Sequence, residues 1–148
     1  ENRTMAYALQ PITLTASATL TREAHAETVI NASAAAGMTL TLPASDGKGS
    51  RFTIRTKTTV TSNNLIVAVA NATDVMTGYA LISQDSADTA VMFETAATSD
   101  TITMNGSTKG GIVGDLIELI DADSGFWQVR VIGSATGTEA TPFSAAVS

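Results

Sequence analysis

Short runs of alternating polarity dominate this chain and restrict its fold more than any other feature. In the run ITLTASATL at 12–20, the aliphatic residues and alanines fall at even positions, and threonine and serine fall at odd ones. An alternation of period two places one face of a β-strand against a core and the other toward solvent. This run therefore predicts a half-buried strand.

Similar runs recur along the chain, separated by glycine, asparagine, aspartate and serine. Short strands at such even spacing are typical of a sandwich or barrel rather than of a parallel α/β sheet. We predict an all-β fold, an antiparallel sandwich or jelly-roll-like barrel of about eight to ten short strands with extended termini. The expected strands are 12–20, 27–31, 38–42, 51–57, 64–70, 79–83, 90–94, 100–104, 115–120 and 126–132.

Turn residues predict two hairpins. DGKG at 46–49 follows Pro43 and is expected to join the strands at 38–42 and 51–57. Gly125 is expected in the left-handed conformation, in a tight turn between 115–120 and 126–132. The alanine-rich stretches 22–27 and 32–37 are too short for independent helices, so loops or single turns are expected there.

The length of 148 residues predicts a single β domain, 1–148. Residues 1–11 lack a clear period and are expected to form an N-terminal arm, and the small, polar stretch 133–148 a C-terminal tail. Leucine, isoleucine, valine and phenylalanine together make up only about 22% of the residues. A core drawn from so few large apolar residues is thin, which favours support from an oligomer.

The charge of the chain argues against nucleic acid and anionic membranes as partners. The net charge is −6 and the pI is near 4.5, whereas binding to phosphates needs clustered lysine and arginine. The charge is also uneven, because residues 1–57 carry a net +2 and residues 58–148 a net −8. The absence of cysteine and of any apolar run of about 18–20 residues predicts a soluble protein made in a reducing cytoplasm.

Residues suited to catalysis or metal binding are few. His25 is the only histidine and lies in a charged stretch, so it is expected to be a surface residue, and without cysteine a structural zinc site is not expected. Glu94, Asp100, Asp115 and Glu118 are expected at solvated strand edges and turns. We therefore predict no catalytic, cofactor-binding or metal-binding residue, and no enzymatic activity.

Four segments together resemble tailed-bacteriophage capsid decoration (cement) proteins, or related small phage virion proteins. They cover a little over half of the chain and are TLTLPASDGKGSRFTIRT at 39–56, TSNNLIVAVANATDVMTG at 61–78, SDTITMNGSTKGGIVGDLIELID at 99–121 and SGFWQVRVIGSATGTEATPFSA at 124–145. The resemblance implies a structural protein on the outer surface of the virion capsid, made in the cytoplasm of the bacterial host. Its implied partner is the major capsid protein, which it would bind as a homotrimer at three-fold or quasi-three-fold junctions, stabilising the head.

The residues suggest how such a protein would contact the capsid. In RFTIRTK at 51–57, Phe52 and Ile54 alternate with a basic side made of Arg51, Arg55 and Lys57. We expect this basic side to meet the capsid, together with Tyr7 and Leu9 of the N-terminal arm, because extended arms can add strands to a partner's sheet.

Two alternatives remain open. A phage fibre-tip or receptor-binding module that binds host-surface glycans would share this threonine-rich, cysteine-free β character, and it would need an exposed aromatic residue beside acidic or amide side chains in a groove. A virion enzyme that cleaves glycan or peptidoglycan would need two carboxylates facing each other across a cleft.

Overall fold

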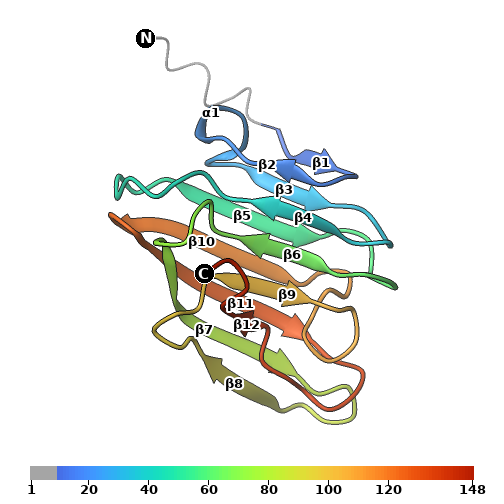
Figure 1. Ribbon diagram of the computed structural model, residues 1–148. Coiled ribbons are helices and arrows are strands. Elements are labelled where there is room, and N and C mark those ends of the chain that lie inside the picture. Colours follow the sequence, from blue (N-terminus) through green and yellow to red (C-terminus); the bar gives the residue numbers. More distant parts are fainter. Residues whose placement is uncertain (1–9) are drawn as a thin grey trace.

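A computed structural model describes residues 10–148, which form two stacked β-sheets and one four-residue helix, α1 (Arg22–His25) (Figure 1). The seven-stranded sheet runs in the order β1 (Ile12–Leu14), β3 (Val29–Ala32), β5 (Arg51–Thr56), β10 (Leu116–Asp123), β11 (Phe126–Ser134), β7 (Val75–Ser83) and β8 (Ala90–Glu94). The five-stranded sheet runs in the order β12 (Phe143–Ser144), β9 (Thr101–Met104), β6 (Leu65–Ala68), β4 (Met38–Thr41) and β2 (Ala18–Thr19).

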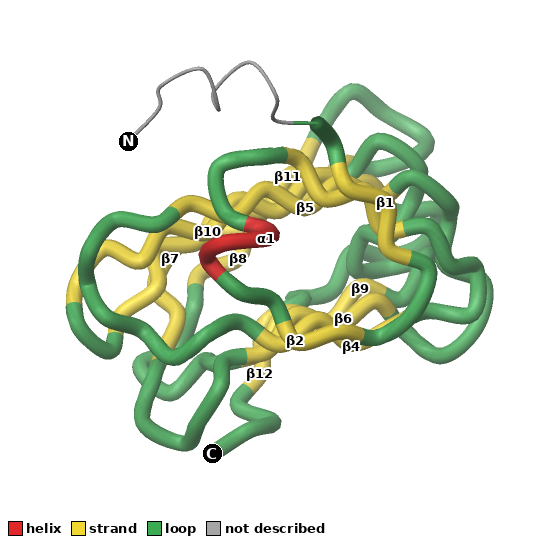
Figure 2. Tube along the Cα trace, turned by 90° about the horizontal axis from the view of Figure 1, so that it is seen from above, coloured by secondary structure: helices red, strands yellow, loops and turns green. Residues whose placement is uncertain are grey.

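The fold is therefore all-β and sandwich-like, as the polarity pattern predicts. Seen from above, the two sheets form two layers, and α1 lies across the space between them at one end (Figure 2). Two parts of the prediction are wrong. The sheets are open rather than closed into a barrel, and both are mixed rather than antiparallel, because β1, β3 and β5 run parallel in one sheet and β2, β4 and β6 run parallel in the other.

The parallel pairs arise because the chain changes sheet after every strand from β1 to β6. Strands that are adjacent in sequence then lie in opposite layers, and each strand pairs with the one two places along, so that the chain forms three stacked coils. Corresponding positions in successive coils are Ile12, Ile30 and Ile54. This geometry corrects the expected hairpin at 46–49, since β4 and β5 belong to different sheets and that loop crosses between the layers.

The second half of the chain mixes hairpins with crossings. β7 and β8 form an antiparallel hairpin, and β10 and β11 form the hairpin that the sequence predicts, with Gly125 at φ 85°. β11 then inserts between β10 and β7 and pairs with β7 in parallel over nine positions, from Phe126↔Val75 to Ser134↔Ser83. Two expected elements differ in extent, because 12–20 is divided into β1 and β2, and β7 begins at Val75 rather than at residue 79.

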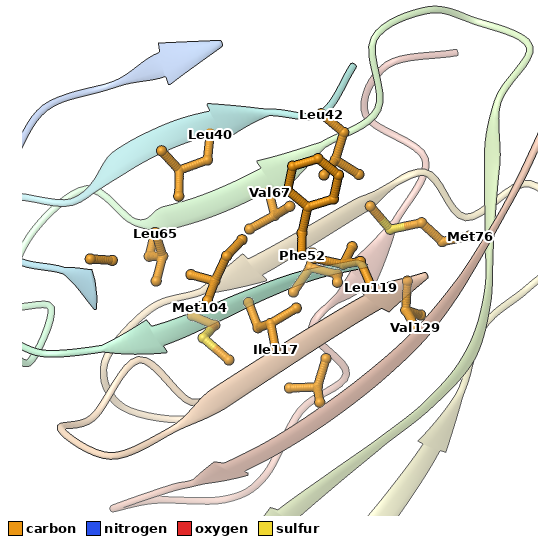
Figure 3. Packing of buried hydrophobic residues seen from close by; sticks show 14 of the residues in the cluster. Leu40, Leu42, Phe52, Leu65, Val67, Met76, Met104, Ile117, Leu119 and Val129 are labelled. Carbon is orange, nitrogen blue, oxygen red and sulfur yellow. The ribbon is translucent and has the colours of Figure 1, made fainter. Parts of the chain in front are cut away.

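Buried side chains from both sheets meet in one continuous core (Figure 3). Leu40 and Val67 from the five-stranded sheet point toward Phe52 and Leu119 from the seven-stranded sheet, and all four are fully buried. Trp127 is also fully buried, and its ring meets Phe52 edge to face with centroids 5.8 Å apart. Offset or edge-on aromatic contacts of this kind stabilise a core beyond the burial of area alone.

The C-terminal segment 133–148 contacts both layers. Its first two residues complete β11, and Phe143, which is buried, begins β12 and pairs with Ile102 of β9. Backbone N–H groups of Val147 and Ser148 donate to the carboxylate of Asp100. Burial alone would raise the pKa of Asp100, but these bonds and that from the Thr101 hydroxyl outweigh it, so the pKa is lowered.

Candidate functional site

The strongest candidate for a functional surface is the outer face of the seven-stranded sheet, the side turned away from the five-stranded sheet. Alternation of buried and exposed positions along β5, β10, β11 and β7 creates this face. In β5, Phe52 and Ile54 are buried in the core, whereas Arg51 is exposed and Arg55 is half-buried on the other side. The alternation predicted for 51–57 is therefore confirmed, and the same rule assigns the outward residues of β10, β11, β7 and β8.

Apolar side chains gather on the part of the outer face formed by β11, β7 and β8. Strand register places Ile132, Leu81 and Met92 side by side in one row, which we call the apolar row. Met92 is 57% exposed and Ile132 is 45% exposed. In the next row, Tyr79 is 50% exposed and lies between Arg130 of β11 and Glu94 of β8. Contiguous exposed apolar residues rimmed by polar ones are typical of an interaction site.

A groove of about 430 Å³ crosses this face from β5 to β8. Its apolar floor and walls include Leu81, Met92 and Tyr79, and its polar lining includes Arg51, Gln128 and the pair Glu118–Arg130. The volume lies within the range of about 300–1,000 Å³ that is usual for sites that hold small ligands.

Charge on the outer face is concentrated on β5. Arg51 and Arg55 project from this strand, and the exposed Lys57 follows it. Arg55 donates to the side-chain oxygen of Asn31 at 3.3 Å. Arg130 differs, because its Nε donates to Glu118 at 2.8 Å and its Nη2 contacts the same carboxylate, which leaves that pair neutral. The face is thus basic at β5 and mainly apolar toward β8.

Of the residues expected to contact a partner, Arg51 and Arg55 lie on this face and Lys57 follows on the same strand line, whereas Tyr7 and Leu9 lie outside the described residues. The sequence interpretation missed Tyr79, Leu81 and Met92. The run VMTGYALIS at 75–83 contained a usable signal of an outward apolar surface, because it has apolar or aromatic residues on both sides of the strand.

The other residues considered for chemistry are held in structural roles. His25 is half-buried, and its Nδ1 accepts a hydrogen bond from the Thr21 N–H at 3.0 Å. Asp100 and Asp115 were expected to be solvated, but both are buried. Burial raises the pKa of Asp115, although its carboxylate accepts bonds from the N–H and hydroxyl of Ser134. Asp100 thus holds the C-terminal residues Val147 and Ser148 in place, and Asp115 holds Ser134 at the end of β11.

Asp121 forms the centre of a network that the sequence did not predict. Its side chain is fully buried and accepts from Arg22 Nη2 at 2.6 Å, Ser45 Oγ at 2.6 Å, and the N–H groups of Asp46 and Gly47 at 2.9 and 3.0 Å. Burial alone would raise its pKa, but these donors outweigh burial and lower the pKa to about 2. These hydrogen bonds connect α1 and the crossing loop 43–50 to β10.

Within residues 10–148, no group of three or more histidine, cysteine, aspartate or glutamate side chains is arranged to hold a metal ion. No helix in this described part of the chain is long and apolar enough to cross a bilayer. Comparisons with protein families, with curated proteins and with solved structures find no match to this chain. The outer face therefore has to be interpreted from its own chemistry.

Proposed function

We propose that this protein is a structural component of a phage virion that binds the outer surface of the assembled capsid and stabilises it. The observation that supports the proposal is the outer face, where half-exposed Tyr79 and Met92 adjoin a strand carrying Arg51 and Arg55. Tyrosine, methionine and arginine are the residue types enriched in protein–protein interfaces, and a central apolar region with a polar rim is their usual layout. Such a face serves adhesion, and the proposal assigns no catalytic residue.

The uneven charge of the chain suggests which side of the protein would face the capsid. The basic β5 side would meet acidic groups of the major capsid protein, and the acidic residues of 58–148 that lie off the outer face would face solvent or neighbouring subunits. A protein that binds only the assembled, expanded shell stabilises that state by mass action. Association as a homotrimer at three-fold junctions, as the resemblance implies, would add avidity because three faces bind together.

Cosedimentation with empty, expanded capsids tests this proposal. The variant Arg51→Glu/Arg55→Glu reverses the charge on β5, and Lys48→Glu/Lys109→Glu makes the same change in net charge on loops outside the strands of the outer face. Reversal of two interfacial charges is expected to weaken capsid binding by at least about tenfold, which corresponds to about 1.4 kcal/mol. The loop variant should bind like the unaltered protein, and binding should weaken with salt.

Equal binding by both double variants would refute the role of β5, and failure of the unaltered protein to sediment with capsids would refute the proposal itself. Removal of residues 1–11 separately tests the N-terminal arm with Tyr7 and Leu9. The proposal expects the shortened protein to stay folded and to lose capsid binding.

One observation favours a second candidate function, the recognition of a host-surface glycan by a fibre-tip module. The groove combines a half-exposed tyrosine, Tyr79, with Gln128 and Glu118, which is the combination of a stacking ring and amide or acidic groups that glycan binding needs. A glycan array would detect this activity, and Tyr79→Ala should abolish it.

A further inference from the structure

Strand β8 is the longest free edge in the described part of the molecule. It pairs only with β7 and closes the order of the seven-stranded sheet, whereas the other three edge strands are short, β1 having three residues and β2 and β12 two each. β8 has five residues, Ala90–Glu94. Edge strands expose backbone groups that can pair with another chain, and natural proteins protect them with short length, lysine, proline or bulges.

The residues of β8 provide little of this protection. The strand reads AVMFE, so it contains no lysine, arginine or proline. Met92 on the outer side is 57% exposed, and Val91 on the opposite side is 37% exposed. Apolar surface is thus available on both sides of an unpaired edge, which is the surface that a further strand would cover.

The hydrogen bonds between β7 and β8 show which backbone groups of β8 are free. Thr95 N–H donates to Gly78 at 3.1 Å, and Gln84 N–H donates to Thr89 at 3.0 Å, at the two ends of the hairpin. In an antiparallel pair, hydrogen-bonded positions alternate with non-bonded ones. Val91 and Phe93 are therefore the positions bonded to β7, and the backbone groups of the intervening Ala90, Met92 and Glu94 point to the open edge.

We propose that β8 pairs in an antiparallel manner with β8 of a second copy of this protein, about a two-fold axis at Met92. This register places Met92 opposite Met92 of the second copy, and Ala90 opposite Glu94. The three positions whose backbone groups point to the open edge of each strand therefore meet the three of the other strand. Val91 then lies opposite Phe93 on the core side. A self-complementary contact of this kind is what two-fold symmetry requires.

The side chains suit this occupant. Across the axis, the apolar row Ile132–Leu81–Met92 continues directly into the Met92, Leu81 and Ile132 of the second copy. The only charged residue of the strand, Glu94, lies opposite Ala90, and four residues of extended strand, about 13 Å, separate it from the other copy's Glu94. That separation exceeds the screening length of about 10 Å in moderate salt, so repulsion is small.

This association goes beyond the proposed function and does not depend on it. A two-fold contact gives dimers from monomers, and it gives hexamers from trimers when all three contacts join the same two trimers. A single pair of five-residue strands is a small interface. Association is therefore expected to be weak and to be detected at about 0.1–1 mM protein, where a free energy of about 4–5 kcal/mol suffices.

Sedimentation equilibrium of the purified protein and of charge variants at position 92 tests the proposal. Met92→Lys and Met92→Glu each place like charges opposite one another at the axis, and each should weaken the doubling step by at least about tenfold. An equimolar mixture of the two variants places lysine opposite glutamate and should restore doubling. Val113→Lys, which changes a 53% exposed apolar residue elsewhere, is the control and should double like the unaltered protein.

Recovery in the mixture supports the proposal, because only a contact that brings position 92 next to its own copy can respond in this way. Absence of doubling by the unaltered protein at about 1 mM would overturn it. So would full doubling by either variant alone, or a mixture that stays undoubled while circular dichroism shows both variants folded.

Discussion

Replacement of Asp121 by asparagine is expected to destabilise the protein strongly although it alters only one atom. Oδ1 of Asp121 accepts from Ser45 and Gly47, and Oδ2 accepts from Arg22 and Asp46. Asparagine has a single acceptor oxygen. In its better orientation this oxygen keeps Arg22 and Asp46, and the amide N–H₂ donates to the Ser45 hydroxyl, which can accept, so the Gly47 N–H loses its partner.

The size of the loss follows from these contacts. One donor loses its partner, and the remaining bonds are made to a neutral acceptor instead of a charged one. Arg22, whose side chain is 27% exposed, keeps the Asp46 carboxylate at 3.4 Å. An unsatisfied buried donor costs about 1–3 kcal/mol, and a bond to a charged group contributes about 1 kcal/mol more than a bond to a neutral one, so a loss of about 3 kcal/mol in the free energy of unfolding is expected. For a chain of this length, 3 kcal/mol corresponds to a decrease in Tm of about 10 °C.

Urea unfolding followed by circular dichroism measures the effect, with the exposed Asp123→Asn as the matched control. The pH dependence supplies a second check. Because the pKa of Asp121 is lowered from 3.8 to about 2, its ionised form stabilises the fold fully above pH 3.8, and this stabilisation is lost as the pH falls to about 2. Asp121→Asn should lack this part of the acid sensitivity. A decrease of less than about 1 kcal/mol in the free energy of unfolding would refute the view that the Asp121 network is a main contributor to holding the crossing loop in place.

Two further substitutions test the packing of the sheets. Gly78→Ala should lower the free energy of unfolding by at least about 4 kcal/mol or prevent folding, because a Cβ at this position would lie 1.8 Å from the Val129 carbonyl oxygen between β7 and β11. Gly49→Ala, at φ 86° with no atom near its Cβ, should cost only about 1 kcal/mol in the same denaturation experiment. Phe143→Ala should cost about 3 kcal/mol and expose the C-terminal segment to limited proteolysis, since this buried ring fixes β12.

The position of most strands could be predicted because each buries one side. The alternation in 51–57 and 126–132 locates β5 and β11 and separates their buried and outward residues. Sheet membership could not be predicted, since a strand that turns into the opposite layer keeps the same alternation. The equivalent positions Ile12, Ile30 and Ile54 are 18 and 24 residues apart, so the coils have no fixed period to reveal them.

The candidate site, too, could be predicted only in part. Arg51 and Arg55 are recognisable from their own strand, but the groove also needs β7 next to β11, a parallel pairing between segments about 50 residues apart. Local pattern holds no information about that neighbour. The starting point of β7 was missed for a local reason, because Thr77 and Gly78 suggest a turn, whereas the close approach of Val129 is what requires the glycine.

The insertion of β11 between β10 and β7 sets an order of events during synthesis. Until residues 126–134 leave the ribosome, the β7–β8 hairpin has no neighbour in the larger sheet, while β1 to β6 can already stack. Domains are made from the N-terminus onward, so the β7–β8 hairpin waits for this later strand. Completion of the groove, and of any assembly that uses it, therefore has to wait until residues 126–134 have been made.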